Sequence, residues 1–232
     1  MDRSVDVPRF AVGAGYAVYQ GPVWDSGTHR HAAFQIAIAL RGEVAMVDAA
    51  AVEHRDVVLV VPPMVRHRIL AAPDLLTFFV EPHCAFADRL RAGTRRHAAA
   101  GIVTAPGLKD LRENDIGMAP STELDPRLVQ AMTALADRSA PMPGVAAAVG
   151  LSPQRLRALA RQQLGMPLTR WRVWARLRRA AEALRDGQSL VDAAVTAGFA
   201  DQAHLTRQMR EMMGITPAAV LPILRGQSRR AT

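Results

Sequence analysis

The chain has 232 residues, of which 50% are hydrophobic and 22% charged, and its formal net charge is +8. This composition is typical of a globular protein and excludes a wholly disordered one. No stretch approaches the roughly 18 uninterrupted apolar residues of a membrane span, so we expect no membrane partner and no signal peptide. Because Cys84 is the only cysteine, an intrachain disulfide is excluded and a cytoplasmic location is expected.

The charge is distributed unevenly along the chain. Residues 1–125 contain 13 Lys and Arg against 15 Asp and Glu, a net charge of −2, whereas residues 126–232 contain 16 Arg against 6 acids, a net charge of +10. A near-neutral front and a basic back predict two modules, the second of which faces a polyanion. A membrane-surface or RNA-binding patch would have the same composition.

Residues 10–81 consist of short runs rich in Val, Ile, Phe and Tyr, separated by Gly, Pro and Asp: AVGAGYAVYQ, FQIAIALRGEVAMV, DVVLVVP and LLTFFVEP. Strands at this spacing predict a β-sandwich or small β-barrel. A helix is expected from Ala85 to Arg96, followed by a segment of Gly, Pro and polar residues. We therefore predict a front domain at 1–105, a linker at 106–125 and a second domain at 126–232.

The segment HRHAAFQ carries a candidate metal site. His29 and His31 alternate on an expected strand, so they point to the same side, and Gln35 has the same parity. His67 follows Val-Pro-Pro-Met-Val-Arg, just past another expected strand. Three imidazoles and one amide oxygen that converge inside a barrel could bind a divalent metal such as Zn, Ni, Mn or Fe. The same side chains could instead line an effector pocket or satisfy polar groups of the core.

The front module also resembles the cupin family over about residues 10–85, in the spacing of Gly21, His29-x-His31-x-x-x-Gln35, Gly42 and a proline-rich turn before His67. This resemblance implies a small β-barrel with a metal at the positions of the three histidines and Gln35. In metal-binding cupins the position of Gln35 is commonly glutamate, so the chain lacks one charge there.

Beyond Leu124 the hydrophobic period becomes helical. The run DPRLVQAMTALADR places Leu128, Met132 and Leu135 on one face of a helix that begins near Pro126. A longer helix is expected over 167–186, with arginines on one face and an apolar stripe on the other: Leu168, Trp171, Trp174, Leu177, Ala181 and Leu184. We interpret this stripe as core, and Gly187 as the end of the helix.

The basic half contains an internal repeat. AVGLSPQRLRALARQQLG and TAGFADQAHLTRQMREMMG superpose at an offset of 49 residues, which aligns the helix caps Ser152 with Asp201 and the terminal glycines Gly165 with Gly214. Each unit follows a short alanine-rich helix. We therefore predict two helix-turn-helix motifs, at about 142–165 and 189–214, whose second helices the long helix holds about one DNA turn apart.

The exposed faces of these second helices are the candidate DNA contacts. If Leu156, Leu159, Ala160 and Leu164 pack inward, the first helix presents Gln154, Arg155, Arg157, Ala158 and Arg161. If Leu205, Met209 and Met212 pack inward, the second presents Gln202, Ala203, His204, Thr206, Arg207 and Arg210. Arginine and glutamine pair bidentately with guanine and adenine edges. The alternative is that both are ordinary solvated helix faces, which would leave the repeat and its charge unexplained.

The segment from about Met142 to Arg225 resembles the DNA-binding domain of AraC/XylS-type transcription regulators. The resemblance rests on SPQRLRALARQQLG, ARLRRAAEAL and above all GFADQAHLTRQMREMMGITP. It implies base-reading positions at Gln154, Arg157 and Ala158, and at Gln202, Ala203, His204, Thr206 and Arg207. The family usually has an aromatic residue late in each second helix, where this chain has Ala160 and Met209. AraC-type regulators often carry a cupin-like barrel as their sensor.

The expected fold is therefore α+β and multidomain, with a cupin-like β-barrel followed by an all-α domain of two helix-turn-helix units. The expected function is a sequence-specific DNA-binding transcription regulator without enzymatic activity, whose front domain binds a small effector or a divalent metal. The alternative is a metal-dependent cupin enzyme fused to a DNA-binding domain. Double-stranded promoter DNA is the main expected partner, and RNA polymerase and a second copy of the chain are further candidates.

Overall fold

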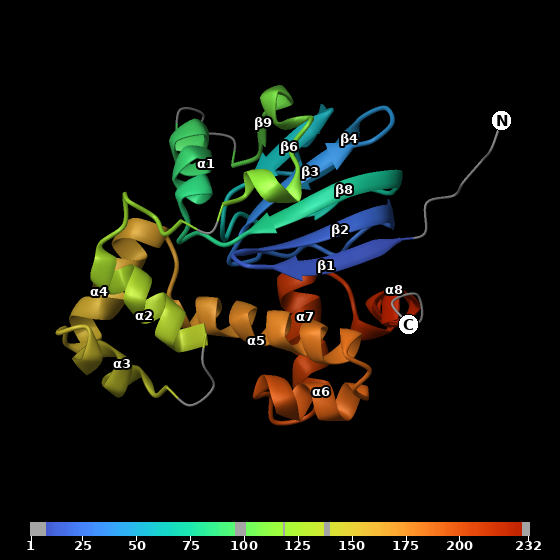
Figure 1. Ribbon diagram of the computed structural model, residues 1–232. Helices are drawn as coiled ribbons and strands as arrows, with labels where there is room; N and C mark the ends of the chain where they lie inside the picture. The colour runs from blue at the N-terminus through green and yellow to red at the C-terminus, as the bar shows by residue number, and fades with distance from the viewer. Residues whose placement is uncertain (1–7, 96–100, 118, 137–139, 229–232) are drawn as a thin grey trace.

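The computed structural model describes residues 8–95, 101–117, 119–136 and 140–228. The N-terminal part consists of antiparallel β-sheet and the C-terminal part of helices (Figure 1). The prediction of an α+β chain with two successive parts is confirmed. None of the described helices is both long and apolar enough to span a membrane.

Two antiparallel sheets form the N-terminal part. The larger has the order β1-β2-β8-β3-β6-β9, with the bounds Arg9–Gly13, Tyr16–Val23, Ala72–Val80, Phe34–Ala39, Val58–Val61 and Val103–Thr104. The smaller has the order β5-β4-β7, with the bounds Glu53–Asp56, Val44–Asp48 and His67–Ile69. All residues of β3 and β6 are buried, because these strands are covered on both faces and are rich in the β-branched and aromatic residues that pack well there.

The segment after the sheets is more ordered than its composition predicts. Helix α1 spans Ala85–Arg95, and the predicted last residue, Arg96, lies outside the described residues. Strand β9 pairs with β6, and two short 3-10 helices follow at Pro106–Leu108 and Glu113–Asp115. Leu111 and Ile116 are buried in the same cluster as Val58 and Val60. The predicted linker at 106–125 thus packs partly on the larger sheet. The predicted boundaries between the two domains stay predictions.

Seven helices form the C-terminal part in the described residues. They are α2 (Pro126–Ala136), α3 (Met142–Ala148), α4 (Pro153–Leu164), α5 (Leu168–Arg185), α6 (Leu190–Ala197), α7 (Gln202–Met213) and α8 (Pro217–Ser228). The pairs α3–α4 and α6–α7 are the two predicted helix-turn-helix units, and α5 joins them (Figure 1). Leu128, Met132 and Leu135 of α2 are fully buried, as the helical period predicts.

The two units have the same helix caps. The Ser152 hydroxyl accepts a hydrogen bond from the N–H of Arg155 at 3.1 Å, and the Asp201 carboxylate accepts one from the N–H of His204 at 2.6 Å. Each satisfies an N–H that the first helical turn leaves without a partner. Gly165 ends α4 at φ +67° and Gly214 ends α7 at φ +68°, in the left-handed region that favours glycine. The predicted repeat is therefore present in the backbone.

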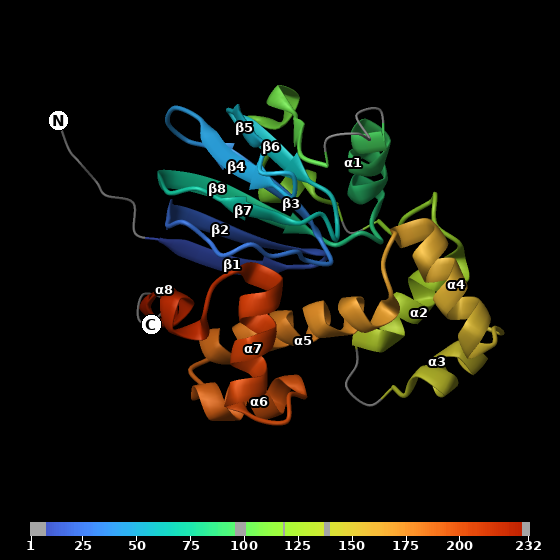
Figure 2. The ribbon, with the colours of Figure 1, turned by 180° about the vertical axis from the view of Figure 1, so that it is seen from behind.

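The sheets and the helices share a hydrophobic core. One buried cluster contains Ala33 and Phe79 of the sheet part together with Trp171, Trp174 and Met212 of the helical part. Helix α5 passes below β1, and α7 rises from α6 toward the sheet (Figures 1 and 2). Residues far apart in the sequence are thus in contact where the two parts meet.

Candidate functional site

Helix α4 presents its predicted polar face to solvent. Leu156, Leu159, Ala160 and Leu164 are buried. The five predicted DNA-facing residues are all exposed: Gln154, Arg155, Arg157, Ala158 and Arg161. The inward and outward faces lie where the helical period predicts them.

Helix α7 exposes only part of its predicted DNA-contacting face to solvent. Leu205 and Met212 are buried and Met209 is half-buried, while Gln202, Ala203, Arg207 and Arg210 are exposed. The other two predicted contacts are used by the protein itself. The ring of His204 packs edge-on against Phe199 with centroids 5.3 Å apart, and the Thr206 hydroxyl donates to the carbonyl of Gln202 at 2.9 Å. Both side chains are half-buried, so Gln202, Ala203, Arg207 and Arg210 are the more accessible set.

Among the described residues, the exposed arginines of the two helices form no salt bridge, although the charge of Arg155 helps to lower the pKa of Asp125. Other arginines of the helical part are paired: Arg170 with Glu211 at 2.5 Å and Arg178 with Glu81 at 2.8 Å. Among the described residues no carboxylate lies within salt-bridge distance of Arg155, Arg157, Arg161, Arg207 or Arg210. Their positive charges are therefore available to an external polyanion.

The three predicted metal-ligand histidines converge in the front part. His29, His31 and His67 are buried, and one possible ligand atom from each lies within 4.8 Å of the others. His29 and His31 lie in the loop between β2 and β3, so the expectation that they alternate along a strand is wrong. A single antiparallel bridge joins His29 to His67, in which His29 N–H donates to the carbonyl of His67 at 2.9 Å and His67 N–H donates to the carbonyl of His29 at 3.1 Å.

The three imidazoles share one tautomer. Each Nδ1 lies within hydrogen-bond distance of a backbone carbonyl oxygen: that of Gly27 for His29 at 2.8 Å, Ala33 for His31 at 2.8 Å and Val65 for His67 at 3.0 Å. A carbonyl can only accept, so Nδ1 carries the proton in each ring. The Nε2 atoms then have free lone pairs. Carbonyl partners on the second ring nitrogen are typical of metal-binding histidines.

Gln35 closes the cluster. Its Oε1 lies 2.9 Å from Nε2 of His31 and 2.8 Å from Nε2 of His67. With Nδ1 protonated, this contact would bring three acceptor atoms together without a hydrogen. Two arrangements remove the conflict. Either a cation lies among these atoms, or the amide is turned so that its NH₂ group donates one hydrogen to each Nε2.

Burial keeps the cluster neutral. Burial first, and then the charge of the neighbouring histidines, lower the pKa of His31 to about 4 and that of His67 to about 2. The pKa of His29 is also lowered by burial, against the hydrogen bond to Gly27. At pH 7 all three rings are therefore unprotonated at Nε2, which is the form that binds metals.

The remaining histidines and Cys84 serve other contacts. His54 Nε2 lies 2.9 Å from Asp48 Oδ2, and the ring of His83 packs edge-on against Trp171. His97, to which the sequence assigned no role, lies outside the described residues. Cys84 is buried and its thiol pKa is raised by that burial, as expected of a structural rather than a reactive cysteine.

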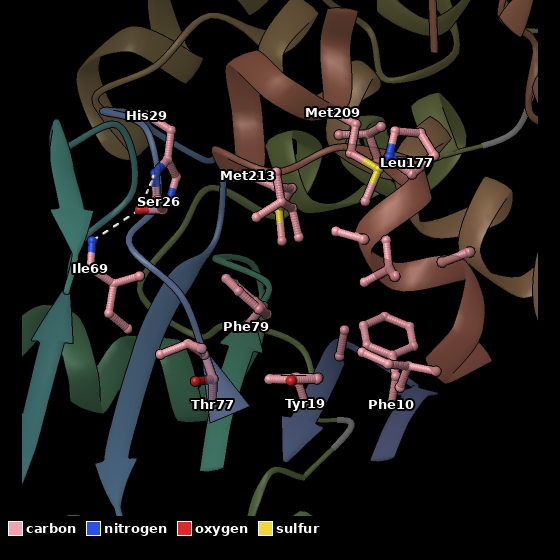
Figure 3. Close-up of a pocket in the computed structure, with 18 of the residues that line it drawn as sticks. Phe10, Tyr19, Ser26, His29, Ile69, Thr77, Phe79, Leu177, Met209 and Met213 are labelled. Carbon is pink, nitrogen blue, oxygen red and sulfur yellow. Dashed lines mark hydrogen bonds between the residues drawn. The ribbon is translucent and has the colours of Figure 1, made fainter. Parts of the chain in front are cut away.

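A cavity of about 410 Å³ lies between the sheets and the second helix-turn-helix unit. Figure 3 shows residues of the sheet part on one side of it and residues of α5 and α7 on the other. Its lining is mainly apolar and includes Phe10, Tyr19, Phe79, Leu177 and Met209.

The sequence did not predict this cavity. Leu177 and Ala181 were expected in the core, but both are half-buried and line the cavity. The available signal was the methionine-rich end of α7, where Met209 replaces the aromatic residue usual in the resembled family and Met213 follows one turn later. Flexible methionines are common where an apolar surface adapts to a partner.

Comparison with known proteins finds a family match within the helical part. A family model described as a helix-turn-helix domain matches residues 145–222. Comparison with curated proteins finds no match. A transcriptional regulator with an AraC-type DNA-binding domain from Chromobacterium violaceum is 25% identical, with a TM-score of 0.40, over 46% of this chain and 96% of that one.

Solved structures of ToxT are similar over nearly the whole chain. ToxT from Vibrio cholerae O395 has a TM-score of 0.57 at 10% identity, covering 92% of this chain and 100% of that one. An unsaturated fatty acid bound ToxT from Vibrio cholerae strain SCE256 has a TM-score of 0.58 at 10% identity, covering 93% and 98%. At this identity the likeness establishes a shared fold. Residues 145–222 of the chain thus match a helix-turn-helix domain, and they follow an N-terminal part of antiparallel sheets in a fold similar to that of ToxT.

Proposed function

We propose that this protein is a sequence-specific DNA-binding transcription regulator that reads promoter DNA with α4 and α7. The observation that carries the proposal is the pair of matched, capped helices whose exposed arginines form no salt bridge among the described residues. Two helix-turn-helix units in one chain can lay their second helices in successive segments of the major groove. Arg157 and Arg207 are the candidate base-reading arginines, because guanine offers two acceptors to a guanidinium.

The test is selection of genomic fragments by the purified protein. A shared sequence should be enriched among the bound fragments, and the protein should bind it roughly 10³-fold or more tightly than random DNA. Similar affinity for both would reduce the arginines to phosphate contacts and overturn sequence-specific reading. Genes beside the enriched site then point to the chemistry of the effector.

We infer that the interdomain cavity is the effector site. Its volume lies within the range of small-molecule pockets, and its lining combines apolar side chains with a few polar ones. It is bounded by α5, α7 and α8 as well as by the sheets, so an occupant contacts the second DNA-reading unit directly. A ligand with different affinities for two positions of that unit changes DNA binding. The fatty acid bound by the similar ToxT supports an apolar effector.

The histidine cluster fits a divalent metal such as Zn, Ni, Mn or Fe. Three neutral imidazoles with fixed Nδ1 protons and the amide oxygen of Gln35 would hold it, and a cation there is one of the two arrangements that remove the lone-pair conflict at Gln35. When bound, the ion supplies a positive charge that can attract a further oxygen donor. The cluster contains no carboxylate among the described residues, so we propose a sensing rather than a catalytic role for it.

A further inference from the structure

The cavity and the histidine cluster adjoin each other. His29 and Gln35 line the cavity, while His31 and His67 lie behind them in the same cluster. Figure 3 shows His29 and Ser26 on one side of the pocket and Phe10 and Leu177 on the opposite side. The pocket is therefore polar at one end and apolar at the other, which suits an amphipathic occupant with a single polar head.

Among the described residues that line the cavity, the one positively charged side chain is already paired with a carboxylate. Among the described residues, Arg178 is the only lysine or arginine that lines the cavity, and it donates to the buried carboxylate of Glu81 at 2.8 Å. Asp25 adds a negative charge to the lining. An anionic head buried here without a counter-ion would lose its hydration without compensation.

A metal ion in the histidine cluster would supply the counter-charge that an anionic head needs. Three imidazoles and one amide are neutral ligands and would leave the charge of a dication uncompensated, so the site favours an anionic further donor. His29 and Gln35 are the members of the cluster that line the cavity, so such a donor reaches the ion from the cavity side. Catalytic and sensing sites differ from closed structural sites in keeping such a position open.

The opposite end selects the rest of the ligand. Phe10, Leu177 and Met209 line it, and Met213 lies between this end and His29 (Figure 3). These side chains offer no charge and favour a hydrocarbon body. The methionines can adapt to its shape.

We propose that the effector is an apolar carboxylic acid whose carboxylate coordinates a metal ion held by His29, His31, His67 and Gln35, with its hydrocarbon body against α5, α7 and α8. This rests on the metal site and the effector cavity of the proposed function. The new element is that the effector binds to the metal ion itself. Effector binding is then metal-dependent.

The experiment compares two probes of equal length, decanoate and 1-decanol, on the full-length protein. Metal content is first measured by mass spectrometry after chelator treatment and after reloading with Zn²⁺. Calorimetric titration should show that decanoate binds the loaded protein at least tenfold more tightly than the stripped protein, whereas the affinity for 1-decanol changes less than threefold. In protein reloaded with Co²⁺, decanoate and not 1-decanol should change the visible absorption of the ion.

Two variants test which end of the cavity binds the carboxylate and which binds the hydrocarbon body. His67→Ala, which lies outside the cavity, should abolish the metal-dependent part of decanoate binding, and the chelator arm gives the same comparison on wild-type protein if this variant does not fold. Leu177→Ala should weaken both probes to a similar degree.

The outcomes separate the proposals. Bound metal with equal decanoate affinity in stripped and loaded protein would overturn the joint site but leave the metal site and the regulator standing. No bound metal would overturn both the metal site and this inference, and leave DNA reading, which is measured separately, unaffected.

Discussion

Gly214, the residue that ends the second DNA-reading helix, lies directly against His29 of the histidine cluster. A methyl group at Gly214 would lie 2.7 Å from Nδ1 of His29 and 2.7 Å from the carbonyl oxygen of Gly27. Contacts this short require one of the groups to move. The candidate sensor and the end of α7 are thus in contact without any intervening side chain, and a change at His29 can reach the helix directly.

Replacing Gly214 by alanine should destabilise the protein more than the same change at Gly165. Both glycines end a helix in the left-handed region, at φ +68° and +67°, so both variants have the backbone cost of about 1–2 kcal/mol. Only at Gly214 must Gly27 and His29 also move, since nothing lies within 4 Å of the position that a methyl group would occupy at Gly165. Urea unfolding of both variants measures the difference. Equal losses would show that the contact with His29 is unimportant.

Replacing Arg207 by alanine should weaken binding to the selected DNA site by about 1–3 kcal/mol and binding to random DNA much less. The reason is that a bidentate contact to guanine is lost only where that base is present. Arg41→Ala is the matched control, because Arg41 is exposed and lies in the sheet part. Fluorescence anisotropy at fixed salt measures both affinities. Equal losses on the two DNAs would identify Arg207 as a phosphate contact.

Replacing His31 by alanine should remove the metal. His31 is fully buried and contacts Gln35, so its loss opens the ligand set. The decrease in metal affinity should exceed the roughly 10–100-fold that loss of an outer-shell partner costs. His54→Ala is the control, because His54 contacts Asp48. Metal content after dialysis is the measurement, and a wild-type level in the His31 variant would contradict the site.

Replacing Ala181 by phenylalanine should block the effector cavity. Ala181 lines it from α5, so a larger side chain there would occupy space that a ligand needs. The variant should lose at least tenfold in affinity for an apolar probe while binding DNA in its absence. Thr169→Phe, at an exposed position of the same helix, should leave probe binding unchanged. Unaltered probe affinity in Ala181→Phe would place the effector elsewhere.

The protein should lose stability below pH 6.5 in part through His83. Burial first, and then the charge of Arg178, lower the pKa of His83 to about 4. Between the unfolded value near 6.5 and the folded value the unfolded chain binds more protons, so the free energy of unfolding falls as pH falls. The slope for one histidine is at most about 1.4 kcal/mol per pH unit, and above pH 6.5 the contribution is constant.

Urea unfolding of metal-free wild type and His83→Gln at pH 7.5, 6 and 5 measures this effect. The neighbouring Glu81 is present in both proteins, so the difference between their slopes isolates His83. Its 3.9 Å distance to Glu81 is no ion pair at neutral pH, because the ring is then uncharged. Parallel pH profiles would show that His83 titrates normally.

Local features of the helical part were predictable because they depend on neighbouring residues. Ser152 and Asp201 cap their helices through an N–H three residues away, and Gly165 and Gly214 end them through their own backbone angles. The apolar face of α4 follows from the helical period alone. By contrast, β9 has only two residues and exists because it pairs with β6, which composition does not reveal.

The sequence by itself determined which side chains are available: two capped basic helices, three histidines and one amide. Only the tertiary structure decided how they combine. His29 and His67 meet through a single bridge between the β2–β3 loop and the start of β7. The cavity lies where α5, α7 and α8 face the sheet part. The physical reason is that caps and helical faces are set by contacts within about one turn, whereas a cluster or a cavity depends on how separate elements pack.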